Sequence, residues 1–324
     1  MSRYSSTEID YRNLMTQYPW VVEREQNCIL SPDSDGLLCG LLMSRYLGWR
    51  IRGFYDGKVL AVKDGINPQD CVFLDMEIFR PNIRSVGQHM VMYDKANLPP
   101  NWGNFDNCIA ANNIRNYDFK NNFKLKYPLG TVHVLLSVLG QTQIISIPKS
   151  AVAPLLYTDG TFKNQFNYPE NFLSWLDYLG ANNTNNHLQK VFLDRHYSTY
   201  ELMNELKDLF AEINVIGGGK RGGDKIKISD SRGNIVNIDP RTHQLKSATR
   251  TQAEAFLRML ANKTGWNFIP TSWSWGPYQT TRFRKGSVKP GKARYNALLA
   301  QNPISLAIIS RNSIEYTIDD SGVL

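Results

Sequence analysis

The sequence predicts an α/β protein in which a mostly parallel sheet is flanked by helices, with a smaller α+β domain at the C-terminus. Two apolar runs of strand length, residues 28–30 and 71–74, each lead to an aspartate, and the first is followed at once by leucines at helical spacing. Two hairpin-like patterns then lie in the last third of the chain, at residues 225–238 and 304–318. We therefore predict two domains, residues 1–195 and 196–324.

The first domain is organised around residues 28–47, CILSPDSDGLLCGLLMSRYL. This pattern predicts a strand, a turn and a helix, and the turn carries Asp33 and Asp35 beside the helix N-terminus. Such a turn lies at the C-terminal edge of a parallel sheet, where α/β folds place ligands. Two carboxylates this close repel each other and need a cation or another partner. The alternative is that both aspartates only cap the helix and shape the turn.

The next segments extend the same sheet edge. Residues 49–55 and 58–62 read as strands around an Asp-Gly turn, and the buried-strand pattern of residues 71–74 ends at Asp75. A further extended piece, residues 85–92, carries His89. If these strands are parallel neighbours, the acidic residues and His89 lie together, and an oxygen-rich cluster with one imidazole suits Mg²⁺ or Mn²⁺ better than zinc. A purely structural role for His89 fits the pattern equally well.

The order of these pieces resembles the DHH phosphoesterase superfamily, which includes RecJ-type exonucleases, oligoribonucleases and inorganic pyrophosphatases. The matching motifs are strand–SPDSDG–helix, then VFLD, then SVGQHMV, and the turn LLYTDGT is similar to the fourth motif of that family. The resemblance covers about residues 27–165. Carried over residue by residue, it implies a catalytic, metal-binding set that takes Mn²⁺ or Mg²⁺: Asp33, Asp35, Asp75, His89 and Asp159.

Three positions depart from the family pattern. Ser31 stands where the first motif usually has a histidine, and Gly87 and Gln88 stand where the third motif has Asp-His. These departures leave three alternatives open: a site with one metal, a site that binds metal weakly, or a site without catalytic activity.

Downstream of these motifs, residues 131–139 predict an apolar core helix and residues 199–213 an amphipathic helix. A glycine-rich loop follows at residues 217–223. Glycines let backbone amides point at an anion, and two basic residues add charge, which makes the loop a candidate phosphate cradle. It lacks the spacing of known nucleotide-binding loops, so a flexible hinge is the alternative. The candidate phosphate contacts here are Gly218, Gly219, Lys220 and Arg221.

The net charge of +8 arises entirely in the last quarter of the chain, because residues 241–324 contain 12 basic and 4 acidic side chains. There, Trp266, Trp273, Trp275 and Tyr278 precede a basic segment that we predict to be a loop. Arg282, Arg284 and Lys285 are its candidate phosphate contacts. Aromatic residues beside basic ones suit single-stranded nucleic acid, whose bases stack while its phosphates pair with charge. The alternative is that the tryptophans belong to the core and the charges are only solvated.

A capping box at Thr249 and Gln252, with Gly265 beyond the C-terminus, predicts a helix over residues 249–263. No apolar run approaches the roughly 18 residues of a membrane span, and the N-terminus lacks the apolar core of a signal peptide. We therefore expect a cytoplasmic protein with no membrane partner. The four cysteines form no CxxC pair and predict buried, reduced thiols.

Together these features favour a metal-dependent phosphodiesterase that acts on nucleic acid or a nucleotide, as a single-strand exonuclease or an oligonucleotide hydrolase. One alternative is a catalytically inactive DHH-like subunit that binds nucleic acid. The other is a small-molecule phosphatase or pyrophosphatase, which would not need the basic, aromatic tail.

Overall fold

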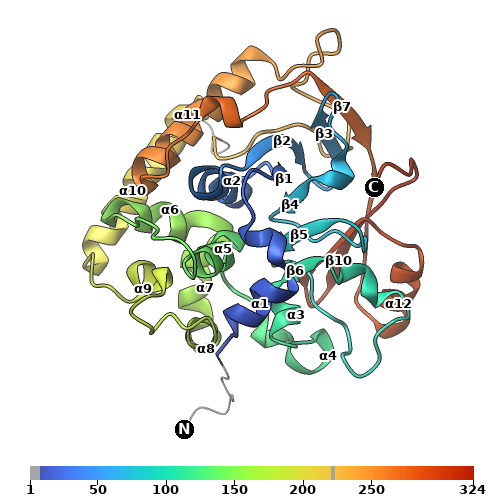
Figure 1. Cartoon of the computed structure of the whole chain (residues 1–324), viewed down its shortest axis with the longest axis horizontal. Coiled ribbons are helices and arrows are strands. Elements are labelled where there is room, and N and C mark those ends of the chain that lie inside the picture. The colour runs from blue at the N-terminus through green and yellow to red at the C-terminus, as the bar shows by residue number, and fades with distance from the viewer. Residues whose placement is uncertain (1–7, 220–222) are drawn as a thin grey trace.

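The computed structural model of the chain describes residues 8–219 and 223–324. It confirms the predicted fold class: a seven-stranded, mostly parallel sheet is flanked by helices, and a three-stranded antiparallel sheet lies in the C-terminal region (Figure 1). The strand order is β6-β5-β4-β1-β2-β3-β7 in the large sheet and β8-β10-β9 in the small sheet.

The strands of the large sheet are β1 (Asn27–Leu30), β2 (Arg50–Tyr55), β3 (Val59–Lys63), β4 (Val72–Leu74), β5 (Arg84–Gly87), β6 (Cys108–Ala110) and β7 (Tyr278–Arg282). Those of the small sheet are β8 (Arg284–Val288), β9 (Ser305–Ser310) and β10 (Ser313–Ile318). The helices are α1 (Tyr11–Gln17), α2 (Ser34–Leu47), α3 (Ala111–Ile114), α4 (Phe119–Asn122), α5 (Thr131–Leu139), α6 (Val152–Tyr157), α7 (Thr161–Asn167), α8 (Pro169–Tyr178), α9 (His187–Phe192), α10 (Thr199–Ile216), α11 (Ser247–Thr264) and α12 (Lys292–Ala300).

Strand β1 lies at the centre of the seven-stranded sheet, between β2 and β4, and pairs parallel with both. Its apolar residues are completely buried, as expected for a strand covered on both faces. The chain leaves β1 toward β2 on one side and later continues from β4 to β5 on the other. The gap between β1 and β4 is therefore a topological switch point, the place where open α/β sheets bind ligands at the C-terminal strand edge.

Helix α2 follows β1 through a tight turn. Asp33 is its N-cap and accepts a hydrogen bond from the Gly36 amide (3.3 Å). A Cβ at position 36 would lie 2.1 Å from the carbonyl oxygen of Ser31, so this turn requires glycine. The helix packs against α5 and α11, which places the turn in the middle of the molecule.

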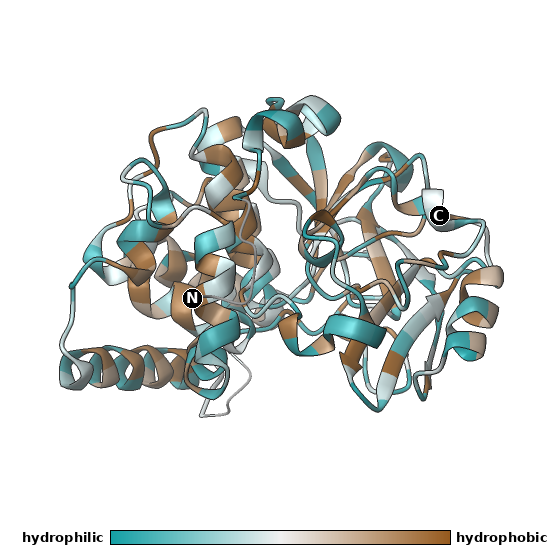
Figure 2. Ribbon diagram, turned by 90° about the horizontal axis from the view of Figure 1, so that it is seen from below, coloured by the Kyte–Doolittle hydropathy of each residue, from teal (hydrophilic) through white to brown (hydrophobic). Residues whose placement is uncertain are grey.

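The C-terminal half of the chain completes the large sheet as well as forming the small one. β7 pairs antiparallel with β3, and α11 packs against α2, α6 and α10. Figure 2 shows mostly hydrophobic strands inside, whereas the helices alternate between hydrophobic and hydrophilic residues. The domain boundary at residue 195 stays a prediction, although β7 from beyond it shares a sheet with the first domain.

Several predicted elements differ from the structure. The segment 225–238 contributes isolated bridges, including one between Ser229 and Ile235, in place of a two-stranded hairpin. α11 begins at Ser247 with Lys246 as its N-cap, so the predicted start and capping box at Thr249 are wrong. The two residues before Thr249 are exposed and include Ala248, a strong helix former, so the helix continues past the predicted cap. The predicted basic loop is wrong too, because β7, β8 and α12 occupy it.

The cysteines, the C-terminal end of α11 and the terminal hairpin agree with the sequence-based predictions. All four cysteines are buried and free. Gly265 ends α11 in the left-handed conformation, and the terminal hairpin forms as β9 and β10. Within the part of the chain that the structure describes, no helix combines the length and apolar character needed to cross a membrane.

Candidate metal centre

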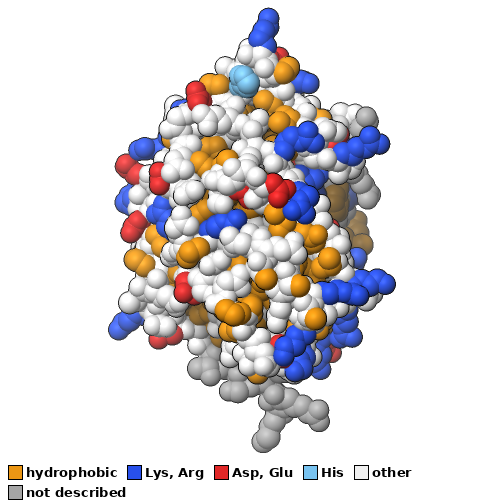
Figure 3. Space-filling view, turned by 90° about the vertical axis from the view of Figure 1, so that its right-hand side faces the viewer, with side chains coloured by type: hydrophobic (Ala, Val, Ile, Leu, Met, Phe, Trp, Pro, Cys, Tyr) orange, Lys and Arg blue, Asp and Glu red, His pale blue; other side chains and the backbone are white. Residues whose placement is uncertain are grey.

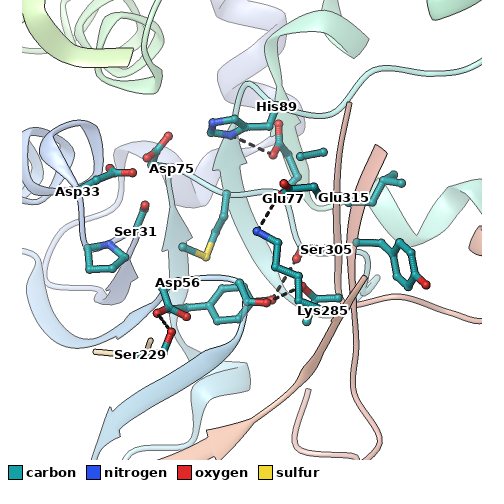
Figure 4. Close-up of a pocket in the computed structure, with 18 of the residues that line it drawn as sticks. Ser31, Asp33, Asp56, Asp75, Glu77, His89, Ser229, Lys285, Ser305 and Glu315 are labelled. Carbon is teal, nitrogen blue, oxygen red and sulfur yellow. Dashed lines mark hydrogen bonds and ion pairs between the residues drawn. The ribbon is translucent and has the colours of Figure 1, made fainter. Parts of the chain in front are cut away.

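The ends of three parallel strands and one helical turn converge at the switch point. Asp33 follows β1, Asp75 follows β4 and His89 follows β5 after one intervening residue, while Asp159 lies in the 3₁₀ turn Thr158–Gly160 between α6 and α7. Figure 4 shows the side chains of Asp33, Asp75 and His89 around one end of a common cavity. The predicted convergence of residues distant in sequence is therefore present.

Three of these side chains could hold a metal ion. One ligand atom from each of Asp75, His89 and Asp159 lies within 4.8 Å of the others, and His89 Nε2 is 3.8 Å from Asp159 Oδ2. Asp75 is almost fully buried, while the side chains of His89 and Asp159 are partly exposed. Two carboxylates and one imidazole in this arrangement fit a divalent cation.

Backbone conformation helps to direct both carboxylates. Asp75 has φ of 65° and Asp159 has φ of 50°, in the left-handed region that non-glycine residues seldom adopt. Such conformations cluster at ligand-binding sites, where the surrounding structure enforces them.

Asp35 lies outside this group of three side chains and is hydrogen-bonded to α5. Its carboxylate is completely buried and accepts hydrogen bonds from the amides of Thr131 (2.5 Å) and Val132 (3.1 Å) at the N-terminus of α5. The Thr131 hydroxyl donates to Asp75 Oδ1 (2.8 Å), which joins the two acidic residues through one threonine. Asp35 therefore anchors α5 to the site, where the positive end of the helix dipole favours a carboxylate.

The cluster is short of positive charge. Burial raises the pKa of Asp75 well above its usual range, and the charges of Asp35, Asp33 and Asp159 raise it further. Burial, followed by the charge of Asp35, raises the pKa of Asp159 to about 8. Burial lowers the pKa of His89, but its interaction with Glu77 and the charge of Asp159 outweigh this effect and raise the pKa to about 9. A cation placed among these groups would relieve the repulsion.

Glu77 is a site residue that the sequence reasoning missed. It is buried, accepts a hydrogen bond from the Met90 amide (2.9 Å) and lies 3.8 Å from His89 Nδ1. A Cβ at Gly87 would lie 2.6 Å from the Glu77 carboxyl carbon, so Glu77 fills the space beside the residue that departs from the family pattern. An acidic residue two positions after Asp75 in a buried segment was the available signal.

Gln88 and Lys126 are two further neighbours of the cluster. The Gln88 side-chain amide donates a hydrogen bond to Asp159 Oδ2. Gln88 therefore contacts the site, although its residue type departs from the third motif of the DHH family. Lys126 is partly buried and donates to the carbonyl oxygen of Ile308 in β9 (2.8 Å). Burial lowers the pKa of Lys126, and the nearby charges of Glu77 and Asp159 act to raise it. Nothing in its local sequence signalled this position.

The acidic cluster opens into a cavity of about 600 Å³ between the large and the small sheet. Ser31, Asp33, Asp75, Glu77 and His89 line one end. The remaining lining comes from the β2–β3 turn, the segment after the glycine-rich loop and the small sheet, and its basic residues are Lys225, Lys227 and Lys285. Lys285 points into this cavity and pairs with Glu315 (2.5 Å) (Figure 4).

The other predicted phosphate contacts lie elsewhere. Gly218 and Gly219 form the turn after α10, away from the described cavity lining, and Lys220 and Arg221 lie outside the described residues. Arg282 donates to the side-chain oxygen of Asn234, and Arg284 pairs with Asp320 (3.0 Å). In Figure 3, which views the side of the molecule that carries the small sheet, basic side chains are spread among neutral and acidic ones.

The aromatic residues of the C-terminal region belong to the core. Trp266, Trp273, Trp275 and Tyr278 are all buried, and Trp275 stacks on Phe54 of β2. The prediction that these rings stack on nucleic-acid bases is therefore wrong, because burial in the core leaves them inaccessible. The basic side chains of Arg282, Arg284 and Lys289, in contrast, are exposed.

No family model, curated protein or solved structure matches the chain. The DHH resemblance thus stays an expectation that rests on the motifs themselves.

Proposed function

We propose that the protein is a metal-dependent phosphodiesterase that acts on nucleic acid or a nucleotide. The observation that carries the proposal is the convergence of Asp75, His89 and Asp159 at the switch point of the sheet, next to a cavity large enough for a nucleotide-sized group. The DHH resemblance points to the same chemistry.

Mn²⁺ or Mg²⁺ suits the donor set best. Both ions favour carboxylate oxygens, and Mn²⁺ also accepts an imidazole, whereas a zinc site would be richer in histidine or cysteine. The raised pKa of Asp75 and Asp159 supports a bound cation, because each carboxylate is costly to ionise without one.

The protein residues around this ion would have different roles. Asp75, His89 and Asp159 would hold it, and Glu77 would orient the His89 imidazole from behind, as acidic partners of metal-bound histidines do. A divalent cation supplies Lewis acidity, which neutralises phosphate charge and lowers the pKa of a water molecule. Asp33 lines the cavity beside Asp75 and is placed to accept a proton from an attacking water.

The substrate would enter from the side of the small sheet. Lys225, Lys227 and Lys285 line the cavity, and phosphates pair readily with such side chains. A cavity of about 600 Å³ holds one nucleotide, so a chain end or a short single strand fits better than a duplex.

A second candidate function is a nucleic-acid-binding protein with the same fold and no catalysis. One observation favours it: the Gln88 amide already donates a hydrogen bond to Asp159, which gives this metal-ligating carboxylate a neutral partner. In that case the lysine-lined cavity would bind phosphate without cleaving it.

The deciding experiment is an assay of the purified, metal-stripped protein with a single-stranded oligonucleotide labelled at one end and with bis-p-nitrophenyl phosphate. We expect hydrolysis when Mn²⁺ or Mg²⁺ is added and none with a chelator. Binding of the oligonucleotide without cleavage under every metal condition would favour the second candidate. Hydrolysis of pyrophosphate alone would instead favour a small-molecule phosphatase.

A further inference from the structure

Lys126 is linked to the backbone of the acidic cluster through one residue of β9. It lies in the segment before α5, and its Nζ donates to the carbonyl oxygen of Ile308, while the amide of Ile308 donates to the carbonyl oxygen of His89 (3.2 Å). The same residue of β9 therefore fixes Lys126 and the backbone beside the metal ligand. This hydrogen bond and partial burial hold the lysine side chain in a defined place.

The acidic groups around it outnumber the cations that could offset them. Asp75, Glu77 and Asp159 act on the same small volume as His89, and Asp33 and Asp35 add their fields. The negative charges of Glu77 and Asp159 act to raise the pKa of Lys126. The positive charge of Lys126 in turn acts to lower the pKa of His89. Its ammonium thus shares the electrostatic environment of the proposed ion.

The other polar groups around the cluster already have hydrogen-bond partners within the protein. Both oxygens of Asp35 accept amide hydrogen bonds from α5, and Asp33 accepts the amide of Gly36. Gln88 directs its side-chain nitrogen, not its oxygen, at Asp159. Within the described residues, one group of at least three closely spaced metal-binding side chains remains, Asp75 with His89 and Asp159.

We propose that this site binds one divalent cation, and that Lys126 acts as a fixed positive charge in place of a second one. The inference rests on the metal-binding part of the proposed function and deepens it. In two-metal phosphoesterases, the second ion offsets charge on the phosphate and on the leaving oxygen. A lysine tied through Ile308 to the backbone of His89 can supply that charge without adding a further metal equivalent.

The first measurement is the number of ions bound. The metal-stripped protein is titrated with Mn²⁺ while electron paramagnetic resonance follows the free ion. We expect one equivalent to bind tightly. Two tight equivalents would overturn the inference, and so would the absence of any bound Mn²⁺.

The second measurement uses Lys126→Met, which keeps the length of the side chain and removes its charge. Two cations repel each other, so we expect Mn²⁺ to bind this variant about tenfold more tightly, or a second equivalent to appear, while hydrolysis slows by at least about tenfold. A role limited to packing would leave Mn²⁺ affinity unchanged or weaken it. Either of those results overturns the inference.

Two further variants separate charge from folding. Lys126→Arg keeps the charge, and we expect its Mn²⁺ affinity to stay within about threefold of the parent protein. Lys124→Met removes an exposed lysine two residues away and should change neither affinity nor rate. If Lys126→Met fails to fold, as judged by circular dichroism, the inference is tested by the other two measurements. It then requires one tight Mn²⁺ equivalent in the parent protein and an unchanged Mn²⁺ affinity in Lys126→Arg.

The results also separate this inference from the proposed function. One equivalent with tighter binding in Lys126→Met but no hydrolysis by the parent would support the charge role and reject the phosphodiesterase. Hydrolysis with two bound equivalents would retain the phosphodiesterase and overturn the role of Lys126.

Discussion

The two regions for which the sequence predicted phosphate chemistry differ in the sign and the burial of their charged side chains. At the C-terminal edge of the parallel strands, Asp75, Glu77 and Asp159 are drawn together in a mostly buried volume. In the basic segment of the C-terminal region, Arg284 and Asp320 form an ion pair in which both side chains are more than half exposed. The first region gathers acidic side chains in a mostly buried place, whereas the second has a net positive charge whose side chains stay exposed to solvent.

This contrast indicates where a ligand is required. An exposed, balanced ion pair contributes little to stability and creates no demand for a partner. Buried like charges raise the free energy of the folded protein until a cation or a proton neutralises them. We therefore place the chemistry at the acidic edge and assign the basic segment a supporting part, mainly through Lys285.

The largest expected effect comes from removing one carboxylate from the acidic edge. Asp75→Asn keeps the shape of the side chain but removes its charge, and we expect Mn²⁺-dependent hydrolysis to fall by about three orders of magnitude or more. Without metal, the melting temperature should rise by about 2 °C or more, because the like-charge repulsion is relieved. Rate assays and calorimetry provide the two readouts.

The matched control is Asp70→Asn, which changes an exposed aspartate near the opposite end of β4. It should leave both rate and melting temperature unchanged. If Asp75→Asn turned over substrate as fast as the parent protein with excess Mn²⁺, Asp75 would not belong to the site. The contrast between the two regions would then lose its basis.

A second prediction concerns the core of the C-terminal region. Trp273 is buried, and its ring closely approaches Gly40 of α2, so Trp273→Ala should lower the free energy of unfolding by about 3–5 kcal/mol. Denaturant titration measures the loss. If the variant were as stable as the parent but bound oligonucleotide poorly, the ring would serve recognition, and our assignment of these tryptophans to the core would fail.

The third prediction is a pH dependence of the metal-free protein. Asp159 has a folded-state pKa of about 8, above the value near 4 expected in the unfolded chain, so the folded state retains a proton that the unfolded state releases. Its contribution to stability is present at low pH and is lost as the pH rises toward 8. His89, whose pKa is raised to about 9, acts in the same direction between about pH 6.5 and 9.

We therefore expect the melting temperature without metal to fall between pH 5 and pH 9. Saturating Mn²⁺ should reduce this fall, because the ion replaces the protons. Calorimetry across this pH range tests the expectation, and a melting temperature that rose with pH would contradict it. Carboxylates with lowered pKa, such as Asp94 and Asp230, titrate below this window and serve as an internal reference.

The smallest expected effect distinguishes two neighbouring basic residues. Lys285 lines the cavity, whereas Arg284 pairs with Asp320 outside it. Lys285→Ala should weaken binding of a single-stranded oligonucleotide and flatten its salt dependence by about 0.7 log unit per decade of salt, as expected for one lost phosphate contact. Arg284→Ala should leave the slope unchanged. Equal changes in both variants would show that the basic surface acts as a whole.

The sequence alone determined the framework of the first half of the chain. The apolar runs before Ser31 and Asp75 predicted β1 and β4, and the leucine spacing after Asp33 predicted α2. These signals are local: a buried strand needs consecutive apolar residues, and a helix needs them at its own period. Because parallel strands end at one edge, the approach of Asp33, Asp75 and His89 followed from the same patterns.

Only the tertiary structure decided how each side chain is used. Asp33 and Asp35 look equivalent in the sequence, yet Asp33 faces the cavity, while α5 supplies two amides that engage Asp35. Glu77 and Lys126 joined the site through contacts with Gly87 and Ile308, which no local pattern encodes. The tryptophans turned inward because β7 extends the large sheet and brings them against it. Local periodicity predicts where strands and helices form, whereas burial, charge balance and side-chain partners depend on segments that are distant in the chain and meet only on folding.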